Sequence, residues 1–433
     1  MPATGPATSH AAADRCPGAL RLAVAADGHL ARIRLPGGLI SAGQIRALAR
    51  LADELGDGRA ELTSRGNVQL RGLAADAADP LTDRLTRAGL LPSLSHDRVR
   101  NVLASPLAGL DGGNDLTAVI RALDAGLCAR ARLAELSGRF LFAVDDGRGD
   151  VADLGADVVA RVRADGAAVN GLEVAPGGST VEQDGSTVEQ DGSTVEQDGS
   201  TVEQDGSTAR ADADAIVAVM LACAEAFLDE AAAQGGTAWR IADLADGAER
   251  VRAAVAARLQ LAAAPHPTTA PQPPTAPQPT TGGASRPVGI VGPDGTAAVL
   301  LAPLGRLTAA QLTWLADRVT ERPARITPWR SVVLPDLPDA AGVLREADRL
   351  GFGVDAASPW LRLSACTGRP GCASALADVQ ADAAAFAARW PERIVHVSGC
   401  ARHCGRPAAT QIDVTATSEG YQVDGVRLHP RRR

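Results

Sequence analysis

The stretch AELTSRGNVQL at residues 60–70 is matched, far along the chain, by ARITPWRSVVL at residues 324–334. The two align without a gap, and both alternate in the way that predicts a β-strand. The likeness extends to residues 28–73 and 295–337, each with a strand, a glycine-containing turn, a helix cap (Ser41 and Thr308) and an amphipathic helix. Such a repeat predicts two halves related by approximate two-fold symmetry, with a ligand at or near their junction.

An α/β segment follows each half, from about His96 to Leu261 and from about Pro359 to the C-terminus. The apolar periodicity predicts helices at residues 115–136, 209–233, 241–261, 341–350 and 373–390. Strands are predicted at residues 139–145, 168–174, 394–396 and 411–415.

Two segments read as low-complexity sequence. Residues 179–206 are four copies of STVEQDG, and residues 264–287 are rich in Pro, Thr and Gln. The copies carry one Glu and one Asp each and no base, so they account for the whole formal net charge of -8. We expect the first to be a disordered surface insertion spanning residues 178–208 and the second a linker with polyproline character.

The remaining composition limits the chemistry and the compartment. The chain has no lysine, which excludes a Schiff-base lysine and a phosphate-loop lysine, so arginine forks must bind any anionic ligand. Residues 1–17 are a small, polar and disordered-looking tail without a secretory signal, and the longest apolar run, residues 215–224, is too short to span a bilayer. We expect a cytoplasmic protein that binds neither nucleic acid nor a membrane.

Four cysteines cluster near the C-terminus, in LSACTGRPGCASALADV (residues 363–379) and VSGCARHCGRP (residues 397–407). In a reducing compartment such clusters indicate metal or redox chemistry. The pattern C-x5-C followed by C-x3-C is wider than the knuckles typical of zinc, and its glycine-rich loops suit a bulkier 4Fe–4S cluster. Zinc remains the alternative. The predicted ligands are Cys366, Cys372, Cys400 and Cys404, whereas Cys16, Cys128 and Cys223 are interpreted as structural or incidental.

This cysteine pattern behind a TPWR half-domain resembles the sirohaem and 4Fe–4S nitrite/sulfite reductase superfamily. LTSRGNVQLRGL (residues 62–73) is similar to its tetrapyrrole-cradling strand, and RVRNVLASPLAG (residues 98–109) to its Arg-Asn-Val segment. The resemblance implies a mixed α/β (α+β) fold, a pseudo-two-fold repeat of ferredoxin-like half-domains, each followed by a reductase-type α/β domain. The implied bounds are a tail at 1–17, half-domain 1 at 18–74, an α/β domain at 75–263, a linker at 264–287, half-domain 2 at 288–338 and the cluster domain at 339–433.

The superfamily has two chemical branches, and the segment LSGRFLFAV (residues 136–144) bears on the choice. Sirohaem reductases carry a Lys-x-Lys pair there to bind sulfite or nitrite, and this chain has Arg139 and Leu141. Losing a cation weakens a site that stabilises growing negative charge. The loop SGCARHCGRP and the chain's modest length also favour precorrin-3B synthase, a monooxygenase of cobalamin biosynthesis. We therefore expect dioxygen-dependent hydroxylation and lactone formation on precorrin-3A, with a sirohaem-dependent nitrite or sulfite reductase as the alternative.

The resemblance also suggests substrate and cofactor contacts. A tetrapyrrole with many carboxylates would be bound by arginines and neighbouring amides. We predict these substrate-binding residues: Arg65, Asn67, Gln69, Arg71, Arg100, Asn101, Arg139 and Arg330. No dinucleotide fingerprint is evident, so electrons would come from a separate NAD(P)H-linked donor through the cluster. A mononuclear non-haem iron is also implied, for which His96 with Asp97, and His396 or His403, are the candidate ligands.

Overall fold

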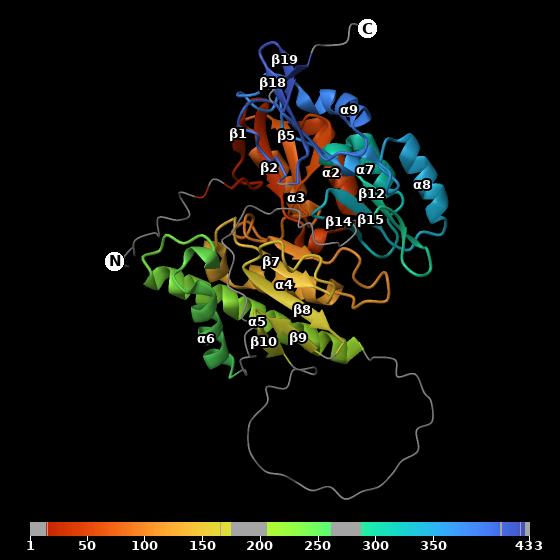
Figure 1. The fold of residues 1–433 in the computed structure, drawn as a ribbon. Coiled ribbons are helices and arrows are strands. Elements are labelled where there is room, and N and C mark those ends of the chain that lie inside the picture. Colours follow the sequence, from red (N-terminus) through yellow and green to blue (C-terminus); the bar gives the residue numbers. More distant parts are fainter. Residues whose placement is uncertain are drawn as a thin grey trace, which may run out of the picture.

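This computed structural model describes residues 14–428, except residues 15, 165, 175–205, 261–286, 408 and 425. The described residues form four five-stranded sheets with helices packed against them (Figure 1). The tail before residue 14, most of the STVEQDG repeat and most of the Pro-rich segment lie outside the described residues. No helix in the described part of the chain is both long and apolar enough to cross a membrane.

The two sheets of the repeat have the same strand order. The first is built in the order β1 (Ala23–Ala25), β2 (Gly28–Ile33), β5 (Val68–Leu73), β4 (Arg59–Leu62) and β13 (Arg306–Thr308). The second has the order β11 (Gly289–Val291), β12 (Ala297–Leu301), β15 (Ser331–Leu334), β14 (Ala324–Ile326) and β3 (Leu39–Ile40). The helices of these halves are α2 (Ala42–Leu55), α3 (Ala78–Arg87), α7 (Ala309–Ala316) and α8 (Ala340–Arg349).

The fifth strand of each sheet comes from the other half. Leu307 of β13 pairs with Ala60 of β4, and Ile40 of β3 pairs with Ala324 of β14, both antiparallel. Helices α2 and α7 pack together, and one apolar core contains residues of both halves. The two halves of the repeat therefore exchange one strand each, and this exchange joins them into one body.

The matching stretches of the repeat adopt the same hairpin. Thr63 N–H donates to Asn67 O and Thr327 N–H donates to Ser331 O, both over 2.9 Å. The helix caps expected at Ser41 and Thr308 are confirmed, since each side chain accepts a hydrogen bond from the backbone of a glutamine three residues on, in a capping box. The common turn explains why the two stretches align without a gap.

The other two sheets also share a topology, three parallel strands followed by an antiparallel hairpin. The first consists of β6 (Val102–Ala104), β7 (Phe142–Asp145), β8 (Val158–Arg163), β9 (Gly166–Val169) and β10 (Leu172–Val174). The second consists of β16 (Leu363–Ala365), β17 (Val395–Ser398), β18 (Ile412–Thr417), β19 (Gly420–Val423) and β20 (Val426–Leu428), with α9 (Val379–Arg389) against it.

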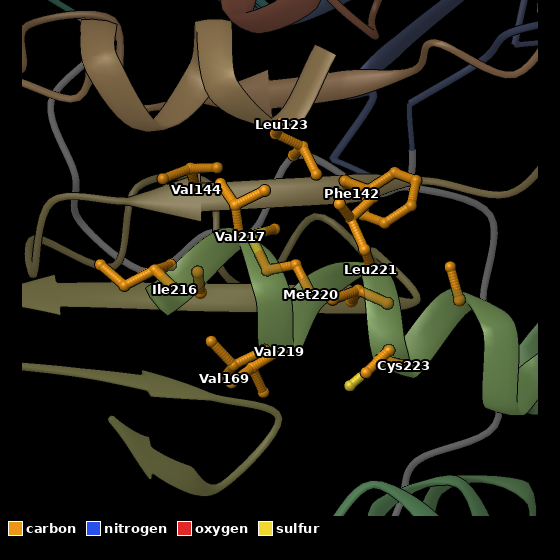
Figure 2. Packing of buried hydrophobic residues seen from close by; sticks show 14 of the residues in the cluster. Leu123, Phe142, Val144, Val169, Ile216, Val217, Val219, Met220, Leu221 and Cys223 are labelled. Atoms are coloured by element: carbon orange, nitrogen blue, oxygen red, sulfur yellow. The ribbon is translucent and has the colours of Figure 1, made fainter. Parts of the chain in front are cut away.

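The largest core lies between the β6–β10 sheet and its helices α4 (Thr117–Ala129), α5 (Gly206–Ala233) and α6 (Gly247–Leu259). Figure 2 shows Val217, Met220 and Leu221 of α5 among Leu123, Phe142 and Val144. Because the chain has few aromatic residues, this core is mostly aliphatic. Cys223 belongs to it, and burial raises the pKa of its thiol to about 12.

Four sequence expectations need correction. The helix predicted at 115–136 ends at Ala129, because Arg130 is extended (φ -106°, ψ 98°) and a 3-10 turn follows at residues 131–135. The strand predicted at residues 168–174 is a hairpin, because Asn170 (φ 47°) and Gly171 (φ 78°) form a left-handed turn between β9 and β10. The helix predicted at 373–390 begins only at Val379, where the Asp378 side chain accepts from Ala381 N–H as its cap. The helix predicted at 241–261 begins only at Gly247, after a short 3-10 turn at residues 241–243 and Asp246 in the left-handed region (φ 52°).

Candidate functional site: a cysteine loop pair beside an arginine-lined sheet

The four clustered cysteines lie on two loops at one edge of the β16–β20 sheet. Cys366 directly follows β16, and Cys400 lies two residues beyond β17. Because β16 and β17 are parallel neighbours, their carboxyl ends meet at the same edge. Cys404 is exposed, and Cys366, Cys372 and Cys400 are half-buried.

The two cysteine loops are held together by backbone contacts. Leu376 N–H donates to Gly399 O over 2.7 Å, and Gly399 N–H points at Cys366 Sγ over 3.1 Å. A Cβ on Gly399 would lie 2.8 Å from Ala375 Cβ, so only glycine allows this approach. A backbone N–H donated to a ligating sulfur is the kind of contact that tunes a metal centre.

The four thiols are not gathered as closely as a single zinc ion would require. Zinc with sulfur ligands at about 2.3 Å requires sulfur atoms about 3.8 Å apart. Among the described residues, one set of three or more potential ligand side chains has its atoms within 4.8 Å of one another, and it consists of Asp145, Asp146 and Asp150. No three of the four cysteine sulfurs are gathered that closely, as the larger 4Fe–4S cluster would allow.

The first sheet of the repeat presents a polar face that begins under these loops. Arg71 of β5 forms an ion pair with Asp27 over 3.0 Å and donates to Gly371 O, also over 3.0 Å. Gln69 lies two residues earlier on the same face, and it accepts a hydrogen bond from Arg32 of β2 over 3.2 Å. The polar face therefore leads from the cysteine loops to Arg32.

Arg32, Arg34 and Arg65, here called the arginine group, have no carboxylate within 4.0 Å among the described residues. Arg34 is 2% exposed and donates only to the backbone carbonyls of Arg32 and Pro17. Burial, followed by the charge of Arg32, lowers the pKa of Arg34 to about 9, and burial also lowers the pKa of Arg32 and Arg65. The Nε atoms of Arg32 and Arg34 are buried without a partner.

Buried guanidinium groups are costly unless an anion pairs with them. The arginine group thus has the character of a binding site for carboxylates. Arg32 and Arg34 were not predicted from the sequence. Their signal is the alternation in ARIRL (residues 31–35), which places both side chains on one face of β2 and its extension.

The predicted residues Asn67 and Asn101 support this site from within. Both are almost fully buried, and Asn67 Nδ2 donates to Asn101 Oδ1 over 3.2 Å. Asn101 Nδ2 in turn donates to Gly138 O, which also accepts Arg65 Nη1 over 3.2 Å. The amide pair therefore holds the loop on which Arg65 rests.

Arg100, Arg139 and Arg330 lie in three different environments. Arg100 is 3% exposed and forms a bidentate ion pair with Asp124, with Nε–Oδ1 and Nη2–Oδ2 distances of 2.6 and 2.7 Å. Arg139 is exposed and lies 4.1 Å from the centre of the Trp239 ring. Arg330 is half-buried in the left-handed region (φ 62°), and burial lowers its pKa. The fork of Arg100 is occupied within the fold, whereas that of Arg330 is not paired with any described carboxylate.

Comparisons with known proteins agree with this architecture. Residues 24–88 match the nitrite/sulfite reductase ferredoxin-like half domain. The NirA protein of Mycobacterium tuberculosis superposes with a TM-score of 0.64 at 20% identity, covering 91% of this chain and 73% of that one. The chain is built on the nitrite/sulfite reductase fold.

Two curated proteins of this superfamily align with most of the chain at the same identity. Ferredoxin–nitrite reductase of Synechococcus elongatus is 27% identical over 428 residues, 92% of this chain and 79% of that protein. Precorrin-3B synthase of a Sinorhizobium species is 27% identical over 436 residues, 97% of this chain and 85% of that protein. The chain is thus similar to oxidoreductases of both branches of the nitrite/sulfite reductase superfamily.

Leu141, where reductases of this fold are expected to carry a second cation, packs into a small apolar cluster. It is 3% exposed and lies with Leu103, Ala143 and Val151. Its backbone N–H donates to Asp157 Oδ2 over 2.9 Å, which fixes the chain there. The position is therefore part of the protein interior.

The histidines suggested as ligands of a mononuclear iron each contact another side chain of the protein. His96 contacts Ser93 Oγ over 2.7 Å and Arg130 O over 3.1 Å, so both ring nitrogens have protein partners. His403 Nδ1 lies 3.1 Å from Asp413, and His396 Nδ1 lies 2.8 Å from Ser364 Oγ. Asp97 accepts backbone N–H groups of Ala19 and Leu20. In the described residues these side chains do not converge on a metal position.

Proposed function

We propose that the protein is a precorrin-3B synthase, which inserts an oxygen atom from dioxygen into precorrin-3A and closes a lactone with a side-chain acetate. The observation that carries the proposal is the contrast between two sets of positions. The arginine group offers three cations without carboxylate partners, as a multiply carboxylated ring requires. At the position where reductases are expected to carry a second oxyanion-binding cation, this chain has the buried Leu141. The guanidinium group of Arg100 is paired with Asp124.

The residues suggest how a ring substrate would be held. The polar face runs from Arg71, which contacts the cysteine loop at Gly371, to Arg32 of the arginine group. A tetrapyrrole lying over this face would have the cysteine loops at one side and carboxylate-binding arginines at the other. Gln69 and Arg71 would contact its edge, and Arg65 would bind a carboxylate.

A 4Fe–4S cluster held by Cys366, Cys372, Cys400 and Cys404 would supply electrons one at a time. Hydroxylation by dioxygen places one oxygen atom in the substrate and releases the other as water, which consumes two electrons and two protons. We propose that a separate NAD(P)H-linked donor protein delivers these electrons. The loops at residues 366–376 and 399–407 carry three arginines and no acidic residue around the exposed Cys404, which suits an acidic donor.

The test begins with the optical spectrum of anaerobically purified protein. We expect absorption of the cluster without stoichiometric sirohaem, and conversion of precorrin-3A to a hydroxylated lactone only when dioxygen and a reductant are both present. Tightly bound sirohaem together with sulfite- or nitrite-dependent electron uptake would overturn the proposal and establish the reductase alternative, which the relative from Synechococcus elongatus represents.

A further inference from the structure

A row of polar side chains, here called the polar row, crosses the outer face of the first sheet of the repeat. In the strand register Gln69 of β5 lies opposite Arg32 of β2 on one side and Glu61 of β4 on the other, and Glu61 lies opposite Arg306 of β13. Partners in register point to the same face of a sheet. The residues that alternate with them lie in the apolar core on the other face, as do Ala31, Leu62, Leu70 and Leu307.

The polar row is hydrogen-bonded from one strand to the next. Arg32 Nη2 donates to Gln69 Oε1 over 3.2 Å, and Gln69 Nε2 donates to Glu61 Oε2 over 2.5 Å, so the amide fixes the orientation of the Glu61 carboxylate. Glu61 Oε1 lies 3.6 Å from Arg306 Nε, beyond hydrogen-bonding distance, and accepts no hydrogen bond from the described part of the chain. One oxygen of an oriented carboxylate is therefore left for a ligand.

Glu61 is the acid of the polar row and lies among cations. Arg32 and Arg306 are the two ends of the row, and after burial the charge of Glu61 is the next influence on the pKa of Arg330. The Glu61 side chain is 16% exposed. Because a carboxylate only accepts hydrogen bonds, this position repels a carboxylate of the ligand and attracts a hydrogen-bond donor.

The ends of the polar row carry cations that suit the edge of a ring. Arg32 belongs to the arginine group, and at the other end a Cβ on Gly305, next to Arg306, would lie 2.7 Å from Arg330 Cδ. A tetrapyrrole whose carboxylates reach both ends would have its centre over Glu61, which lies between them. The centre of a metal-free tetrapyrrole carries pyrrole N–H groups, which are donors. In a reduced ring the pyrroles can tilt so that these groups face one side.

We propose that Glu61 accepts hydrogen bonds from the pyrrole N–H groups of the bound ring and so selects a metal-free, reduced tetrapyrrole. This inference rests on the proposed function, which makes such a ring the substrate. The role of Glu61 differs from that of the arginines, since they bind the periphery of the ring and Glu61 contacts its centre. Glu61 is thus a specificity-determining residue, and the polar row holds its carboxylate in place.

Two octacarboxylate rings with the same side chains test this role in the purified full-length protein. Uroporphyrinogen III is reduced and can turn its pyrrole N–H groups to one face, whereas the planar uroporphyrin III holds its N–H groups within the ring plane. The variant Glu61→Gln keeps an acceptor for Gln69 and removes the charge. By anaerobic isothermal titration calorimetry, we expect Glu61→Gln to bind uroporphyrinogen III at least about tenfold more weakly than the wild type, and uroporphyrin III less than about threefold more weakly.

Asp57→Asn is the matched control, because Asp57 shares Arg306 with Glu61. Its Oδ2 lies 3.4 Å from Arg306 Nη2, and its side chain is 30% exposed. This variant should change the affinity for neither ring. If it weakens uroporphyrinogen III binding as much as Glu61→Gln does, the effect belongs to Arg306 and the role of Glu61 is overturned.

Three other results would overturn the role of Glu61. Equal weakening of both rings in Glu61→Gln would mean that the residue acts through the charge balance of the site. Unchanged affinity for uroporphyrinogen III would mean that no N–H group reaches the carboxylate. A wild-type protein that binds neither ring would remove the ligand itself. Circular dichroism and cluster content equal to those of the wild type show that the variants are folded.

The two proposals fail in different ways. Tightly bound sirohaem with sulfite- or nitrite-dependent electron uptake overturns the precorrin-3B synthase proposal whichever ring Glu61→Gln binds. Wild-type affinity for uroporphyrinogen III in Glu61→Gln, in a protein that converts precorrin-3A, overturns only the role of Glu61.

Discussion

Replacing Arg100 and Arg65 in parallel separates an arginine that holds the fold from one that is available to a ligand. Arg100→Met leaves the Asp124 carboxylate, whose side chain is 22% exposed, without its bidentate partner and removes a donor from Leu90 O. Breaking a buried pair costs about 3–5 kcal/mol, and the partial exposure of Asp124 places the expected loss near the lower end, about 3 kcal/mol.

Arg65→Met should behave in the opposite way. No described carboxylate pairs with Arg65, and after burial the largest influence on its pKa is the like charge of Arg240, so removing the cation should leave stability unchanged or higher. Affinity for a carboxylated tetrapyrrole should fall by about 1–3 kcal/mol, or roughly 5- to 150-fold, as for a lost charged hydrogen bond. Cluster content should be unaffected, because Arg65 does not contact the cysteine loops.

The assay is urea unfolding followed by circular dichroism, combined with uroporphyrin III binding measured by fluorescence. The double variant Arg100→Met/Asp124→Leu closes the cycle and should recover most of the lost stability, since neither charge is then left unpaired. The reasoning is refuted if Arg100→Met keeps wild-type stability and loses ligand affinity, or if Arg65→Met loses about 3 kcal/mol of stability.

Three other changes give distinct outcomes. Cys400→Ser should remove the brown chromophore and most of the iron and sulfide, and full cluster content by metal analysis would refute the ligand assignment. Leu141→Lys should lower the urea midpoint, because it buries a cation among aliphatic side chains, and should not create sulfite reduction; unchanged stability would contradict the packing. Burial raises the pKa of Asp150 to about 6, so the stability that its protonation contributes is complete below pH 3.8 and is lost as pH rises through 6. The stability of Asp150→Asn should therefore exceed that of the wild type by about 1–3 kcal/mol at pH 8 and equal it near pH 4, whereas the exposed control Asp153→Asn should equal the wild type at both pH values.

The fold could be predicted from the sequence because the repeat encodes a local turn. The hydrogen bonds closing the hairpins at Thr63 and Thr327 need only a few neighbouring residues, so both stretches carry the same pattern. The exchange of β3 and β13 could not be predicted, since a two- or three-residue strand has no signal of its own and depends on the other half. The turn residue itself differs, with Gly66 (φ 65°) in one half and Arg330 (φ 62°) in the other.

The spacing of residues in the sequence singles out the candidate cysteines, but it does not show which arginines are paired with carboxylates. The cysteines are recognisable from C-x5-C and C-x3-C alone. An arginine's role depends on whether a carboxylate from another element reaches it. Arg100 forms a bidentate ion pair with Asp124 of α4, whereas Arg34 donates hydrogen bonds only to backbone carbonyl groups. That difference arises from tertiary contacts, so the motif containing Arg100 gives no sign of the ion pair that the structure shows there.

The two α/β sheets show why a nearly symmetric fold has an asymmetric site. Both place a loop at the carboxyl end of their second parallel strand, where Asp145 is the last residue of β7 and Cys400 lies two residues beyond β17. The Asp145 carboxylate accepts four backbone N–H groups of its own loop, between 2.8 and 3.1 Å, so it is occupied in closing that loop. The loop with Cys400 instead presents thiols, and its Gly399 N–H points at Cys366 Sγ on the neighbouring loop. The four clustered cysteines are thus confined to one half and the arginine group to the other, so a ring bound as we propose would lie at the junction and contact both.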